Sequence, residues 1–165
     1  MAGKIKLGCC IPGGSFMPQG VGGMGDSALQ TLLTGCAMVA DAGFDYAEAT
    51  VGAAMKLTSG ETEFARANGL RIEYFNSFIP GQYKILDGRG GYNSALDYAR
   101  AAVERAERLG GELIVLGSGA ARRIPDGLDV SQAFELFARF CAEASELLRA
   151  RGITLALEPL NSGET

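Results

Sequence analysis

The stretch SQAFELFARFCAEASELLRARGITLAL, residues 131–157, decides how the rest of the chain is interpreted. Its first part carries apolar side chains at intervals of three or four positions, with charged residues between them: Phe134, Phe137, Cys141, Ala144 and Leu148. This spacing predicts an amphipathic helix that packs one face on a sheet. Gly152 then suits a helix C-cap, and the apolar run 153–157 has the length of a strand. A helix followed at once by a strand is the repeating unit of α/β proteins.

The same unit recurs along the chain. Four glycines each end a helix-like stretch and introduce a short apolar run: Gly43, Gly69, Gly111 and Gly152. The sequence therefore predicts five strands, at residues 4–10, 44–49, 70–75, 112–117 and 153–157. It predicts helices around residues 29–39 and 93–109, a weaker one at 61–68, and the helix of the first stretch. Strands that alternate with helices in this way are parallel and joined by right-handed crossovers.

Two architectures use this order of elements. One is an open, doubly wound sheet of five strands; the other is a (β/α)₈ barrel of the TIM type, which needs eight strands and about 250 residues. Length favours the open sheet, but no helix follows the fifth strand to cover it, and parallel sheets are buried on both faces. We therefore predict an α/β fold, a single domain over residues 1–165 that is an incomplete parallel TIM-type barrel of about five strands and four helices, truncated after strand five.

Composition excludes several classes of function. The chain has 165 residues, a formal net charge of −4 and no histidine. It therefore lacks the basic footprint of a nucleic-acid-binding protein and has no imidazole to act as a ligand or base. Its apolar runs fall short of the about 18 residues of a membrane span, and its start lacks a signal-peptide pattern. Its four cysteines lack metal-site spacing, so we expect buried, reduced thiols and a cytoplasmic protein.

The candidate site residues follow the predicted strands, because both architectures bind ligands at the carboxyl ends of their strands. Glu158 comes directly after the fifth strand. A carboxylate there faces the mouth of the barrel, and burying it costs several kcal/mol unless it is paired, hydrogen-bonded or bound to a cation. A solvated loop glutamate is the simpler alternative. Glu48 ends the second strand, where it could also be tied to the surrounding loops.

Three segments give the chain a family resemblance: GFDYAE at residues 43–48, GSGAARRIPDG at 117–127 and LEPLN at 157–161. With them the chain resembles the xylose isomerase-like TIM-barrel superfamily, in particular its sugar and sugar-phosphate isomerases and epimerases, including hydroxypyruvate isomerases. The resemblance implies a divalent metal, Mn²⁺ or Mg²⁺, held by Glu, Asp, His and Glu from the last four strands. It also implies that two of these glutamates move a proton next to a carbonyl group, through an enediolate intermediate.

The resemblance assigns roles to individual residues of this chain. Glu158 matches the first metal ligand and is the expected catalytic residue, while the other ligands are expected beyond Thr165. The expected contacts to a small carbohydrate or hydroxy-keto acid come from five residues: Glu48, Asn76, Phe78, Arg122 and Asn161. Because a single glutamate cannot hold a catalytic metal, the 165-residue chain is expected to be inactive alone. The choice between isomerase and epimerase stays open at this point.

Two other functions compete with this interpretation. A self-contained five-stranded binding module would have strand order 2-1-3-4-5 and would make Glu158 a terminal loop residue. A metal-dependent phosphodiesterase similar to apurinic-site endonucleases would need several histidines and a basic face, which this acidic chain lacks. The partial-barrel interpretation instead places Glu48, Asn76, Arg122 and Glu158 at one rim of a curved row of strands. It also predicts an open apolar edge at strand five, so the isolated chain is expected to form a homo-oligomer or to fold poorly.

Overall fold

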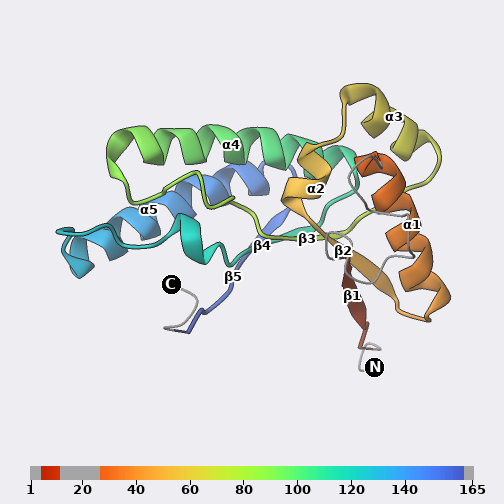
Figure 1. Cartoon of the computed structure of the whole chain (residues 1–165), viewed down its shortest axis with the longest axis horizontal. Helices are drawn as coiled ribbons and strands as arrows, with labels where there is room; N and C mark the ends of the chain where they lie inside the picture. The colour runs from red at the N-terminus through yellow and green to blue at the C-terminus, as the bar shows by residue number, and fades with distance from the viewer. Residues whose placement is uncertain (1–4, 12–26, 162–165) are drawn as a thin grey trace.

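One parallel sheet organises the part of the chain that the computed structural model describes, residues 5–11 and 27–161. Its five strands pair in the order β1-β2-β3-β4-β5, so each strand lies beside its neighbours in the sequence (Figure 1). The strands are β1 (Gly8–Ile11), β2 (Tyr46–Thr50), β3 (Tyr74–Asn76), β4 (Leu113–Leu116) and β5 (Thr154–Leu157). All four pairings are parallel. This is the strand order of a (β/α) barrel and excludes the order 2-1-3-4-5 of the open sheet.

The helices lie together on one side of the strands, where α4 and α5 run next to each other (Figure 1). They are α1 (Ala28–Asp41), α2 (Val51–Met55), α3 (Ser59–Ala67), α4 (Gly88–Arg108) and α5 (Val130–Arg149), with the short 3₁₀ turn η1 (Gly119–Ala121). The sequence did not predict α2, which begins directly after β2. It also predicted a later start for α4, because Gly88, Gly90 and Gly91 are poor helix formers.

Burial alternates along the strands and identifies the face that the helices cover. Ala49, Phe75 and Ile114 are fully buried and belong to the hydrophobic core. Their neighbours on the opposite face, such as Glu48 and Tyr74, are only half-buried. Because Cα partners in register point to the same side of a sheet, polar and aromatic side chains collect on the face away from the helices.

The buried stripe of α5 corrects one sequence prediction. Phe134 was expected on the packed face, but it is 71% exposed. The stripe passes instead through Ala133, Phe140, Cys141, Ala144 and Leu148. Because α5 begins at Val130, Phe134 lies near its start, and the stripe runs through its neighbour Ala133. Both alternatives satisfy a spacing of three or four residues, so periodicity alone could not separate them.

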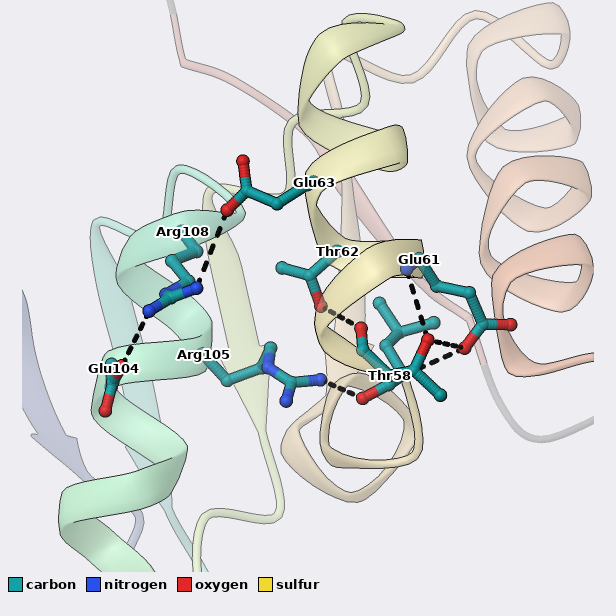
Figure 2. Close-up of polar contacts among 8 residues, drawn as sticks. Thr58, Glu61, Thr62, Glu63, Glu104, Arg105 and Arg108 are labelled. Carbon is teal, nitrogen blue, oxygen red and sulfur yellow. Dashed lines mark hydrogen bonds and ion pairs between the residues drawn. The ribbon is translucent and has the colours of Figure 1, made fainter.

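Polar contacts at the α2–α3 turn hold this part of the fold against α4 (Figure 2). Thr58 and Glu61 form a capping box: Thr58 Oγ1 accepts from the Glu61 amide at 3.2 Å, and the Glu61 carboxylate accepts from the Thr58 amide at 2.8 Å. Arg105 of α4 donates to the carbonyl oxygens of Ala54, at 3.1 Å, and Leu57. These carbonyls end α2 and the turn after it, so the cluster satisfies backbone groups and has a structural role.

The outer edge of β5 is open within the described residues, since β5 pairs there with β4 only. Leu157 at this edge is 53% exposed. The observation agrees with the apolar edge that the sequence predicts at strand five. Self-association of the isolated chain stays a prediction.

Candidate functional site

The structure joins four of the predicted site residues into two hydrogen-bonded pairs, at neighbouring strands of the sheet. Glu48 and Asn76 connect β2 to β3, and Arg122 and Glu158 connect the segment after β4 to the end of β5. One detail differs from expectation. Glu48 lies within β2, two residues before its end at Thr50, while Asn76 is the last residue of β3.

The first pair is a link between side chains on the face away from the helices. Asn76 Nδ2 donates to Glu48 Oε1 at 2.8 Å. Cys10 of β1 is the Cα partner of Glu48, and its Sγ lies 3.6 Å from Asn76 Nδ2. Amide and carboxylate groups on this face are suited to bind the hydroxyl groups of a polar ligand.

Cys10 is a member of this cluster that sequence reasoning missed. It is exposed, whereas buried thiols were expected; of the four cysteines, which are all free, only Cys141 is buried. Partial burial and then the negative charge of Glu48 raise the pKa of the Cys10 thiol. Cys10 therefore stays protonated at neutral pH, and a protonated thiol is a weak hydrogen-bond donor and a poor nucleophile. The register of β1 against β2 is the feature that identifies Cys10, since Cys10 and Glu48 pair across these neighbouring strands.

Glu158 lies directly after β5, and its carboxylate turns toward the end of β4. Its amide donates to the Leu116 carbonyl at 3.2 Å and extends the pairing of β4 with β5 by one residue. A Cβ atom on Gly117 would lie only 2.1 Å from Glu158 Oε2, far closer than atoms can approach. Gly117 therefore supplies the space that the carboxylate occupies. Glu158 is exposed, and among the described residues its carboxylate has no hydrogen-bond or ion-pair partner.

Arg122 follows η1 and reaches the main chain of Glu158. Its Nη2 donates to the Glu158 carbonyl oxygen at 2.9 Å. The centre of the guanidinium group lies 5.5 Å from the centre of the Phe137 ring of α5, within the range of a cation–π contact. Arg122 Nε is buried and has no hydrogen-bond partner within the described residues. An unsatisfied buried donor destabilises the folded state by about 1–3 kcal/mol. Arg122 in this position therefore lowers the stability of the fold by that amount.

The remaining two predicted residues differ in exposure. Phe78 is fully buried in the hydrophobic core and has no exposed surface, so its contact with a substrate stays a prediction. Asn161 is exposed, three residues after Glu158.

A pocket of about 500 Å³ lies beyond the ends of β2, β3 and β4, and sequence reasoning did not find it. Its lining is mostly apolar and includes Thr50, Ser77 and Ser118. The two serines follow β3 and β4 and have positive φ angles of 54° and 45°, which are uncommon for residues other than glycine. Ser118 Oγ also accepts a hydrogen bond from the Ile79 amide at 3.0 Å. No sequence motif marks a serine for this backbone conformation.

The described part of the chain does not form a metal centre by itself. It contains no group of three or more His, Cys, Asp or Glu side chains that could hold a metal ion. Glu158 supplies a single carboxylate, which is too few ligands for Mn²⁺ or Mg²⁺. Any metal site that includes Glu158 would need ligands from outside these residues.

Comparison with known protein families decides the family. Residues 36–165 match the sequence model of the xylose isomerase-like TIM barrel. The chain belongs to this family. The resemblance stated from residues 43–48, 117–127 and 157–161 is therefore confirmed.

Solved structures of sugar epimerases share the fold of this family member. An L-ribulose 3-epimerase is 19% identical, with a TM-score of 0.68 over 96% of this chain and 50% of the epimerase. A D-allulose 3-epimerase from Methylomonas sp. is 17% identical, with a TM-score of 0.67 over 83% of this chain and 48% of the other. A D-psicose 3-epimerase from Clostridium cellulolyticum H10, solved with D-tagatose, is 18% identical, with a TM-score of 0.68 over 79% and 47%.

The chain thus spans about half the length of these enzymes. At these identities the similarity shows a shared fold, which confirms the incomplete TIM-type barrel. No curated protein matches the sequence closely enough to count as a relative. Within the described residues, no helix has the length and apolar character needed to cross a membrane.

Proposed function

We propose that this chain is part of a sugar isomerase or epimerase that moves a proton next to a carbonyl group, with Glu158 as the catalytic base. The observation that carries the proposal is the unpaired Glu158 carboxylate at the end of β5, in the space left by Gly117, within a fold shared by sugar epimerases. In the proposal, residues 1–165 belong to one barrel domain that further strands complete. The chain alone is inactive.

In the proposed reaction, Glu158 takes a proton from the carbon next to the substrate carbonyl. The electron pair of the broken C–H bond forms a carbon–carbon double bond, and the carbonyl oxygen takes up the negative charge. Return of the proton to the opposite face of the same carbon gives an epimer, and return to the neighbouring carbon gives the isomer. Both outcomes share the enediolate, and the position of a second acid decides between them.

We also propose that Glu158 contributes one oxygen ligand to a divalent cation, Mn²⁺ or Mg²⁺, as the family resemblance implies. Such a cation would stabilise negative charge on the substrate oxygens. The described residues do not complete its coordination. The remaining ligands would come from sequence outside this chain or from a second copy in a homo-oligomer.

The proposed substrate is a small carbohydrate or hydroxy-keto acid. Glu48 and Asn76 offer an acceptor and a donor on the face away from the helices, and Asn161 lies three residues beyond Glu158. The pocket beyond β2 to β4 also includes three residues with hydroxyl groups that could bind sugar hydroxyls. The free thiols are compatible with the reducing cytoplasm, where we propose that the protein acts.

Solvent proton exchange tests the proposal directly. The protein, expressed from its complete reading frame with Mn²⁺ or Mg²⁺ present, is incubated in D₂O with D-fructose, D-allulose, D-tagatose, L-ribulose or hydroxypyruvate. We expect deuterium to enter the carbon next to the carbonyl of at least one compound, as measured by NMR. The variant Glu158→Gln should abolish this exchange, whereas Glu135→Gln on the exposed side of α5 should not change it. Exchange that survives in Glu158→Gln would contradict the assignment of the base.

A further inference from the structure

We propose that Arg122 and Gly117 act together as positioning residues for Glu158: Arg122 fixes the main chain after β5, and Gly117 leaves the space into which the carboxylate turns. This inference rests on the proposed function for its catalytic consequence. Its geometric part concerns only residues of this chain and can be tested without any substrate.

The hydrogen bond of Arg122 ends on the backbone carbonyl of Glu158 and not on its carboxylate. Arg122 Nη2 donates to the Glu158 carbonyl oxygen at 2.9 Å. None of the ion pairs within the described residues joins the Arg122 guanidinium to the Glu158 carboxylate. The arginine therefore orients the residue through its main chain and leaves both carboxylate oxygens unoccupied.

The surroundings of Arg122 hold its guanidinium in one place. The Phe137 ring of α5 lies 5.5 Å from the centre of the group, and the Nε atom is buried. A buried Nε cannot reach a ligand in solution. The position of Arg122 is thus set by α5, the helix that leads into β5. Arg122 therefore links α5, through Phe137, to the end of β5, through the Glu158 carbonyl. The substrate contact that the resemblance implied for Arg122 is replaced in this proposal by positioning.

Gly117 affects the side chain of Glu158, whereas Arg122 contacts its main chain. A Cβ at position 117 would lie 2.1 Å from Oε2 and 3.2 Å from the carboxyl carbon of Glu158. The atoms that block a side chain here are the far end of a flexible glutamate, so an alanine would displace the carboxylate and leave the strands in place. Gly117→Ala therefore disturbs the carboxylate of Glu158, and Arg122→Ala disturbs its backbone carbonyl.

The first experiment measures the Glu158 carbonyl itself. The next residue, Pro159, has no amide proton, so the carbonyl carbon is followed in ¹³C-detected spectra that correlate it with the Pro159 nitrogen. The protein is expressed from its complete reading frame, without substrate. We expect Arg122→Ala to shift this carbonyl resonance, and Gly117→Ala and the matched control Arg123→Ala to leave it near its original position. An unchanged resonance in Arg122→Ala would overturn the inference.

The second experiment measures kinetics on the substrate found by deuterium exchange. Arg122→Ala should lower kcat by about 10²-fold with little change in KM, because a displaced base affects the proton transfer and leaves substrate binding intact. Free guanidinium added to the assay should restore part of the lost kcat. Arg123→Ala should behave like the unchanged protein. A rise in KM with unchanged kcat would overturn the inference, since it would place Arg122 on the substrate.

Two further outcomes are a variant that does not fold and a protein without detectable exchange. If Arg122→Ala does not fold, Arg122→Lys decides: it keeps a cation near Phe137 but loses the planar fork, so both the carbonyl shift and the loss of kcat should appear in part. An unaltered Arg122→Lys would overturn the proposal. If no substrate shows exchange but the carbonyl resonance responds to Arg122→Ala, the positioning inference stands and the proposed function fails.

Discussion

The two hydrogen-bonded pairs of the site use their carboxylates in different ways. In the pair between β2 and β3, the Asn76 amide occupies an oxygen of the Glu48 carboxylate. In the pair after β4 and β5, Arg122 holds only the main chain of Glu158, and the carboxylate has no partner among the described residues. A carboxylate that is already engaged suits binding, and one whose backbone is anchored while its oxygens stay unoccupied suits proton transfer.

Removal of the two acidic groups should separate these roles most strongly. We expect Glu158→Gln to lower kcat by about 10²–10⁴-fold, the range that a general base contributes. Glu48→Gln should act mainly on KM, because it alters a binding contact. Steady-state kinetics on the protein from its complete reading frame measures both effects. Equal losses of kcat in the two variants would break the distinction between the regions.

The free energy of unfolding should depend more on the Glu48–Asn76 pair than on the Glu158 carboxylate. Asn76→Ala removes the donor from the part-buried Glu48 carboxylate and should destabilise the protein by about 1–3 kcal/mol. Glu158→Gln should be close to neutral, since the Glu158 carboxylate has no partner to lose within the described residues. Urea unfolding followed by circular dichroism measures both values. An equally large loss in Glu158→Gln would show that its carboxylate is structurally engaged.

The reactivity of Cys10 should report the charge of Glu48. Partial burial, followed by that charge, raises the pKa of the Cys10 thiol, so alkylation at pH 8 should be slow. Glu48→Gln removes the charge, lowers the pKa and increases the thiolate fraction, so alkylation should become several-fold faster. Mass spectrometry of iodoacetamide-treated protein measures the rate at each cysteine. Cys36, whose pKa burial alone raises to about 11, is the internal control and should not change.

The sequence predicted the five parallel strands and the place of Glu158 because both depend on local patterns. Glycine after each helix that leads into a strand, together with apolar runs of strand length, locates the strands, and a charged residue directly after an apolar strand lies at its end. Family membership and the parallel sheet confirm this part of the prediction.

The contacts within the site depended on information that local patterns do not contain. Arg122 and Glu158 are 36 positions apart, and Asn76 and Glu48 are 28 apart, so their meeting follows from strand register and loop path. Phe78 shows the same limit. It comes two residues after β3, where site residues are expected, but Ser77 takes a positive φ and Phe78 lies in the core. Glycine is the residue that normally indicates a positive φ, so a serine at this position does not predict the turn.

Gly117 has a consequence for natural variation in this family. Since a Cβ atom there would lie 2.1 Å from Oε2 of Glu158, a side chain at position 117 and the observed direction of the Glu158 carboxylate exclude each other. Relatives that carry a larger residue at the position of Gly117 should have either a shorter acid in place of Glu158 or a glutamate whose carboxylate turns elsewhere. Covariation between these two alignment columns would therefore record the direction of this carboxylate through the evolution of the family.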